Sequence, residues 1–130
     1  MSASTAVPEV CVVDDDPSVL RSMCFLLESE GLTTRPFNRP EDFLAHASGH
    51  RVFVVVLDIW MDGMTGLEVL ARLCALSPTT RVIIITARED LAARATAMAI
   101  GPVAYFIKPF NDQKFLAAVR EALRQNGGPP

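Results

Sequence analysis

Five short apolar runs alternate with five amphipathic segments along the 130-residue chain. The runs are rich in β-branched residues, which favours strands, and the segments between them repeat apolar residues at helical spacing. We expect strands over residues 10–13, 32–35, 52–57, 82–85 and 103–107. The third run is apolar at every position, as expected for a central strand that is buried on both faces. The pattern therefore predicts a parallel sheet covered by helices.

Capping residues mark where three of the helices begin. Pro17 stands at a first helical position with Asp16 as the N-cap, Thr65 and Glu68 have capping-box spacing, and Asn111 precedes the last helix. The remaining two helices are expected over about 41–47 and 89–100. The predicted buried faces of the three capped helices are Leu20, Met23, Cys24 and Leu27; Leu70, Leu73, Cys74 and Leu76; and Phe115, Leu116, Val119 and Leu123.

Strands that alternate with helices predict a single α/β domain with a doubly wound (βα)₅ parallel sheet. With the strand order 2-1-3-4-5, the order reverses between the first and third strands, where open sheets of this class bind ligands. We expect a flexible N-terminus over residues 1–8, the folded domain over 9–125, and a tail or linker stub over 126–130.

Composition narrows the function classes. The net charge is −3 and no Lys/Arg cluster occurs, which argues against direct nucleic-acid binding. The N-terminus lacks the pattern of a signal peptide, and no apolar stretch is long enough to span a bilayer. The three cysteines stand singly in apolar segments, so we expect them to be reduced and buried. A cytoplasmic protein without membrane contact is predicted.

Polar residues follow four of the predicted strands and should meet at one edge of the sheet. They are Asp14 and Asp15, Asp58, Thr86 and Lys108. Clustered carboxylates repel each other unless a cation joins them, and hard oxygen ligands select Mg²⁺ or Mn²⁺. Lys108 and Thr86 suit the oxygens of a phosphoryl group, and a carboxylate can be its acceptor. These residue types indicate metal-assisted phosphoryl transfer to an aspartate. Asp16 is better explained as the helix cap.

Four motifs in this order resemble the response-regulator receiver domain family over nearly the whole chain. They are Val12–Pro17, Leu57–Glu68, Ile85–Ala87 and Phe106–Phe110. Gly66-Leu67-Glu68 and Lys108-Pro109-Phe110 look most like FixJ-type receivers. The resemblance implies the flavodoxin-like fold of CheY and a role in two-component signalling.

The resemblance also implies roles for individual residues. Asp58 would be the phospho-acceptor, and Asp15 and Asp58 would bind Mg²⁺ directly. Asp14 would assist through a water molecule, and the backbone carbonyl of Trp60 would complete the protein ligands. Lys108 would contact the phosphoryl group. The chain would then be no enzyme in the ordinary sense, because it would catalyse only its own phosphorylation and dephosphorylation.

The family's switch is implied as well. Thr86 would move toward the phosphoryl group, Tyr105 would turn inward behind it, and the bond before Pro109 would be cis. The phosphoryl donor would be a sensor histidine kinase or a phosphotransfer protein. The fourth helix, fifth strand and fifth helix would form the output surface, which would contact a downstream effector or a second copy of the chain.

Three residues near the acceptor are candidates for tuning the lifetime of the phosphoryl group. Trp60 is unusually bulky for its position and could hinder the water that hydrolyses an acyl phosphate. Asp62 replaces the family's usual proline, which adds negative charge and removes a stiffening residue. Arg88, two residues after Thr86, is the third candidate.

Two other functions stay open from the residues alone. Asp14-x-Asp16-x-Ser18 loosely resembles the signature of haloacid-dehalogenase-type phosphatases, which would make Asp14 the nucleophile but leave Asp58 unexplained. The chain could also be a degenerate receiver that only binds partners, although its set of acids, threonine and lysine argues against that.

Overall fold

Parallel pairing joins all five strands of the structure, a computed structural model that describes residues 8–126. The strands are β1 (Glu9–Val13), β2 (Thr33–Phe37), β3 (Val54–Asp58), β4 (Arg81–Thr86) and β5 (Ala104–Ile107). The helices are α1 (Pro17–Ser29), α2 (Pro40–Gly49), α3 (Gly66–Leu76), α4 (Leu91–Ile100) and α5 (Asp112–Gln125). The sheet order is β2-β1-β3-β4-β5, so the predicted topology is confirmed. Most of the predicted N-terminal segment and tail (1–7 and 127–130) lies outside the described residues.

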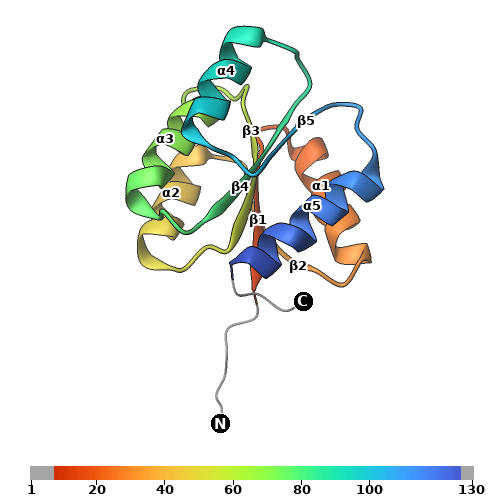
Figure 1. Ribbon diagram of the computed structural model, residues 1–130. Coiled ribbons are helices and arrows are strands. Elements are labelled where there is room, and N and C mark those ends of the chain that lie inside the picture. Colours follow the sequence, from red (N-terminus) through yellow and green to blue (C-terminus); the bar gives the residue numbers. More distant parts are fainter. Residues whose placement is uncertain (1–7, 127–130) are drawn as a thin grey trace.

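The helices cover the sheet in two layers, with α1 and α5 on one face and α2, α3 and α4 on the other (Figure 1). Alternate residues of the central strands supply the two cores, because successive side chains of a strand point to opposite faces. In β3, Val54 and Val56 face α1 and α5, whereas Val55 and Leu57 face the other layer, and all four are fully buried. This two-sided burial explains the uninterrupted apolar run predicted to be the central strand. No helix within 8–126 is long and apolar enough to cross a bilayer.

The predicted helix caps are confirmed. The side chain of Asp16 accepts hydrogen bonds from two backbone N–H groups of the first turn of α1. Thr65 and Glu68 form both halves of a capping box at α3, and the side chain of Asn111 caps α5. Helix α4 begins two residues later than expected, because Asp90 is its N-cap and accepts a hydrogen bond from the third residue of the helix.

Strand β2 is longer than predicted and passes through Pro36. The sequence predicted a strand over residues 32–35 only. Because β2 is the edge strand and pairs only with β1, the missing N–H of Pro36 breaks no ladder on the open side. Helix α2 begins one residue earlier than expected, with Pro40 in its first turn, which is the position that proline favours.

The buried face of α3 is narrower than predicted. The helix buries Val69, Leu70 and Leu73, whereas Cys74 is exposed and Leu76 is 42% exposed. Both exposed residues flank the stripe that faces the sheet, so apolar character alone did not decide their burial. The prediction that the three cysteines are buried is therefore wrong for Cys74.

A cluster of Arg51, Phe53 and Asn126 fastens the end of α5 to the start of β3. The guanidinium of Arg51 donates to the backbone carbonyl of Asn126 at 2.7 Å and lies 4.1 Å from the centre of the Phe53 ring. The side-chain amide of Asn126 donates to the carbonyl of Phe53 at 2.8 Å. These contacts lie at the amino edge of the sheet, opposite the edge where the polar residues gather.

Gly66 brings the first turn of α3 against the loop that follows β3. Its N–H donates to the carbonyl of Ile59 at 2.8 Å. A Cβ at this position would lie 2.2 Å from the carbonyl oxygen of Asp58 and 2.8 Å from the Cα of Ile59. Both neighbours are backbone atoms that cannot rotate away. A glycine is therefore required for the close approach that positions the end of β3.

Gly66→Ala should accordingly destabilise the domain by about 2–4 kcal/mol, since backbone must shift to accept the methyl group. The matched control is Gly49→Ala at the end of α2, where a Cβ meets nothing within 4 Å. That change should be neutral or slightly stabilising. Urea unfolding followed by circular dichroism measures both, and equal stabilities for the two variants would contradict the close-approach argument.

Candidate functional site

Three carboxylates converge at the carboxyl edge of the sheet. Asp14 and Asp15 directly follow β1, and Asp58 is the last residue of β3, the strand paired with β1. Each offers a carboxylate oxygen, and these oxygens all lie within 4.8 Å of one another. Asp14 is 1% exposed and Asp58 is 8% exposed, whereas Asp15 is half-buried. The predicted acidic crevice is therefore present where the strand order reverses.

Burial of these acids makes their ionisation costly. Desolvation, followed by the negative charge of Asp14, raises the pKa of Asp58 to about 6. Desolvation also raises the pKa of Asp14. Lys108, which follows β5, opposes both shifts, and its Nζ lies 3.7 Å from Oδ2 of Asp14. One lysine leaves the cluster with excess negative charge.

Hydrogen bonds orient two of the three acids. Oδ1 of Asp14 accepts the backbone N–H of Asp16 at 2.9 Å, and a carboxylate oxygen of Asp15 accepts the N–H of Asp62 at 2.9 Å. Oδ2 of Asp14 is buried without a hydrogen-bond partner among residues 8–126. A buried oxygen without a hydrogen bond, within a set of hard anionic ligands, fits a divalent cation, which the three carboxylates can hold. Asp16 is occupied as the cap of α1, as expected.

Thr86 is fully buried at the end of β4, but its hydroxyl is bonded within its own loop. Oγ1 donates to the carbonyl of Arg88 at 3.1 Å and accepts the N–H of Arg88 at 3.2 Å. The structure thus places Thr86 at the predicted edge without a hydrogen bond to the carboxylates. Its predicted contact with a phosphoryl group stays a prediction.

Tyr105 lies in β5, half-buried beside α4. Its hydroxyl is buried and has no hydrogen-bond partner within the described part of the chain, and the guanidinium of Arg94 lies 5.1 Å from the ring centre. Desolvation, with a further contribution from the charge of Glu89, raises the pKa of the phenol. The inward turn predicted for this residue stays a prediction.

Trp60 and Arg88 are in contact, which the sequence did not reveal. The guanidinium of Arg88 lies 4.0 Å from the centre of the Trp60 ring. The pair joins the loop after β3, the strand that ends with the acceptor candidate, to the loop after β4, the strand that ends with Thr86. Each residue was a candidate by position alone, and no spacing rule could have paired them.

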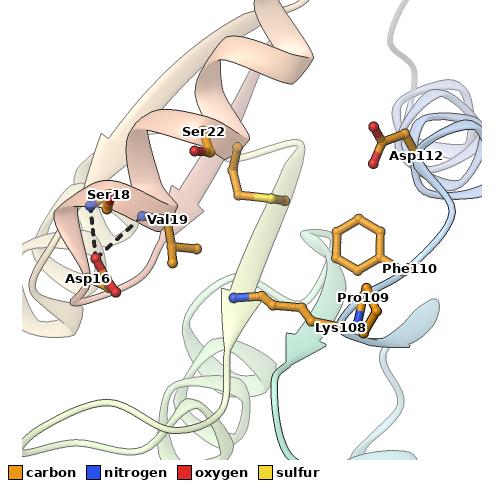
Figure 2. A pocket seen from close by; sticks show the side chains of 9 residues that line it. Asp16, Ser18, Val19, Ser22, Lys108, Pro109, Phe110 and Asp112 are labelled. Carbon is orange, nitrogen blue, oxygen red and sulfur yellow. Dashed lines mark hydrogen bonds between the residues drawn. The ribbon is translucent and has the colours of Figure 1, made fainter.

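A groove of about 500 Å³ opens beside Lys108, between the first turns of α1 and the loop from β5 to α5 (Figure 2). Val19, Met23 and Phe110 give it apolar walls, and Asp112 stands at its rim. The Lys108–Pro109 bond in that loop is cis, as expected. The groove joins two segments that are distant in sequence, and the sequence analysis did not predict it.

The raised pKa of Asp58 has a consequence for stability. Because an unfolded aspartate titrates near 4 and the folded one at about 6, the folded protein binds protons more tightly between these values. Stability should therefore fall as pH rises through this window and stay reduced above it. Without divalent cations, the free energy of unfolding of Asp58→Asn should exceed that of the wild type by about 3 kcal/mol at pH 7.5. The difference should be small near pH 4.

Urea unfolding at the two pH values in EDTA measures this difference. Asp62→Asn makes the same charge change at an exposed position and should have little effect. If the difference in unfolding free energy between wild type and Asp58→Asn were the same at pH 4 and pH 7.5, burial would not make the ionisation of this carboxylate costly.

Comparisons with known proteins agree with this geometry. The family model of the response regulator receiver domain matches residues 10–120. The chain is 39% identical over 119 residues to the uncharacterized transcriptional regulatory protein YkoG of Bacillus subtilis, covering 91% of this chain and 52% of YkoG. It is 37% identical over 114 residues to the transcriptional regulatory protein FixJ of Azorhizobium caulinodans, covering 88% and 54%. The chain thus spans about half the length of these relatives.

The fold comparison leads to the same family. The crystal structure of FixJ-N superposes with a TM-score of 0.84 at 32% identity and covers 92% of this chain and 96% of that one. These matches do not favour the haloacid-dehalogenase-type phosphatase considered from the sequence. The chain belongs to the response regulator receiver domain family, and it is a receiver domain of two-component signalling.

Proposed function

We propose that this receiver accepts a phosphoryl group on Asp58 with the help of Mg²⁺ and changes its output surface in response. The observation that carries the proposal is the convergence of three carboxylates with Lys108 at the carboxyl edge of the sheet. This set is what transfer to an aspartate requires, because it combines a carboxylate nucleophile, ligands for a hard cation and a positive charge for the phosphoryl oxygens.

Asp15, Asp58 and the backbone carbonyl of Trp60 would hold the cation, and Asp14 would act through a water molecule. Mg²⁺, for which Mn²⁺ can substitute, supplies positive charge to the phosphoryl oxygens and to the crowded carboxylates. Oδ2 of Asp14, which is buried without a hydrogen bond, and the raised pKa of Asp58 support this assignment, because a divalent cation would relieve both.

The transfer itself uses the carboxylate of Asp58. One of its oxygens attacks the phosphorus of a phosphohistidine, a new O–P bond forms, the P–N bond breaks, and the imidazole of the donor leaves. Asp58 must be ionised to attack, and a pKa of about 6 leaves it mostly ionised above pH 7. Lys108 would neutralise charge on the phosphoryl oxygens. The chain would act only on its own acyl phosphate, which water later hydrolyses.

The switch would begin at Thr86. Its hydroxyl would exchange its two bonds with Arg88 for one with the phosphoryl group, and Tyr105 would fill the space behind it. The affected surface consists of α4, β5 and α5, where Leu91 is 77% exposed and Met98 is 49% exposed. We propose that a downstream effector or a second copy of the chain binds there.

A sensor histidine kinase or a phosphotransfer protein would dock at the groove beside Lys108. Phe25 is 75% exposed on α1, three residues after Ser22, which lines that groove, and would add apolar surface for such a partner. The relatives are named as transcriptional regulators, but a net charge of −3 gives this chain no basis for contacting nucleic acid itself. We place these encounters in the cytoplasm.

Incubation with acetyl phosphate and Mg²⁺ should add one phosphoryl group, detected by intact-mass spectrometry. Asp58→Asn should abolish the adduct because it removes the nucleophile, and EDTA should abolish it in the wild type. Asp62→Asn is the matched control and should still be labelled. A phosphorylated histidine kinase replaces acetyl phosphate in a second reaction, and sedimentation of the product reports any dimer.

An adduct that survives in Asp58→Asn would refute the acceptor assignment. If no adduct forms, Mg²⁺ binding separates a site with a short-lived acyl phosphate from a degenerate receiver. Trp60 is the only tryptophan of the chain and lies two residues from Asp58, so its fluorescence should change on titration with Mg²⁺. If the Trp60 fluorescence does not change with Mg²⁺ and no phosphoryl adduct forms, the chain is a degenerate receiver that only binds partners.

The Trp60–Arg88 contact should lengthen the life of the acyl phosphate. The stacked pair bridges the loops that follow β3 and β4, and a cation–π contact with an exposed guanidinium is worth about 0.5–1 kcal/mol. Trp60→Ala and Arg88→Ala should each speed the loss of phosphate from Asp58 several-fold by opening a path for water. Decay of the adduct after acetyl phosphate is removed gives the rates, with Trp60→Phe as the ring-retaining control.

Asp62 is the third lifetime candidate. Its backbone N–H holds Asp15, whereas its carboxylate is exposed, so Asp62→Asn tests the charge without removing that bond.

Rates of phosphate loss that are the same in wild type, Trp60→Ala and Arg88→Ala would rule out the stacked pair as a barrier to water.

A further inference from the structure

Two arginines of the segment that leads from β4 into α4 each contact an aromatic ring outside that segment. The guanidinium carbon of Arg88 lies 4.0 Å from the centre of the Trp60 ring. The guanidinium carbon of Arg94, in the first turn of α4, lies 5.1 Å from the centre of the Tyr105 ring. Both distances fall within the range of about 6 Å over which the face of an aromatic ring attracts a cation.

The two contacts fasten this segment to neighbours on opposite sides. Strand β4 lies between β3 and β5 in the sheet. Trp60 follows β3 and Tyr105 belongs to β5, so Arg88 and Arg94 contact rings from the two different neighbours. An ion pair of 3.9 Å between Arg94 and Glu89 also ties the start of α4 to the preceding loop. The segment is therefore held on both sides.

Both residues of the proposed switch depend on these arginines. The hydroxyl of Thr86 donates to the backbone carbonyl of Arg88 at 3.1 Å and accepts its N–H at 3.2 Å. Those two bonds must break before the hydroxyl can reach a phosphoryl group, and the side chain of Arg88 is anchored on Trp60. An inward turn of Tyr105 would likewise separate its ring from Arg94.

We propose that Arg88 and Arg94 are positioning residues that hold the receiver in its unphosphorylated conformation. The inference rests on the proposed function, because the arginines act through Thr86 and Tyr105 and need no contact with the phosphoryl group. Contacts made only in the resting conformation lower the population of the activated one, so a phosphoryl group must part both contacts to complete the switch.

Amide NMR spectra of the full chain test the proposal without any phosphoryl transfer. Beryllofluoride with Mg²⁺ mimics a phosphoryl group on a carboxylate and defines the signal positions of the activated conformation. Arg88→Ala should move the Tyr105 signal toward its activated position in the absence of beryllofluoride, and Arg94→Ala should do the same to the Thr86 signal. Each variant is read at the residue that the other arginine holds, which removes the local effect of the substitution.

Each alanine variant should also raise the apparent affinity for beryllofluoride by about two- to fivefold, the range expected for loss of one exposed cation–π contact. Arg88→Lys and Arg94→Lys keep the cation and should restore part of the wild-type behaviour. Arg72→Ala is the matched control and should change neither readout, because Arg72 is exposed and lines a groove with Leu44 of α2. Arg88 and Arg94 are exposed as well, so their variants should fold.

Two outcomes separate this inference from the proposed function. If beryllofluoride and Mg²⁺ leave the wild-type signals unmoved, the proposed function fails and the role of the arginines fails with it. If beryllofluoride moves the signals of the wild type but not of Asp58→Asn, the switch stands. The inference alone is then overturned if both alanine variants keep the wild-type signal positions and the wild-type affinity for beryllofluoride.

Discussion

Burial of negative charge at the end of a parallel sheet is the constraint around which this domain is organised. Pairing of β1 with β3 places Asp14 beside Asp58, and both side chains are buried. Desolvation then raises the pKa of both carboxyls, and Lys108 offsets only part of the cost. The acidic edge therefore costs the fold stability, and a ligand that brings positive charge would relieve that cost.

Separate contacts hold the two loops that follow β3 and β4 at this edge. Gly66 allows α3 to press on the backbone of Asp58, and the N–H of Asp62 orients Asp15. On the next loop, both hydrogen bonds of the Thr86 hydroxyl go to the backbone of Arg88, while the side chain of Arg88 stacks on Trp60. A movement of Thr86 would therefore break bonds that also position Arg88, so the proposed switch would be coupled to the proposed barrier to water.

The fold could be predicted because its signals are local. Continuous apolar runs, caps such as Asp16 and Asn111, and the order of the polar strand ends all follow from neighbouring residues. The acidic cluster followed too, because parallel strands must bring their carboxyl ends to one edge. By contrast, β2 continued through Pro36 because an edge strand tolerates it, and Cys74 was exposed because the stripe of α3 is narrow.

Contacts between distant segments could not be predicted in the same way. The Trp60–Arg88 stack and the groove beside Lys108 depend on how loops meet in space, and no periodicity encodes that. The need for glycine at position 66 likewise depends on a backbone approach from another element. Sequence reasoning predicted which polar residues gather at this edge, whereas packing between distant segments decides how they are enclosed.

The cluster of Arg51, Phe53 and Asn126 fixes the beginning of β3 against the end of α5. The strand is five residues long, fully buried, and tied at its beginning to the end of α5, while its last residue is Asp58. It is therefore held by hydrogen bonds to α5 at its beginning and reaches the acidic cluster at its end. The end of α5 and Asp58 are thus held at opposite ends of one buried strand, and only the five residues of that strand lead from the carbonyl of Phe53 to the acidic edge of the sheet.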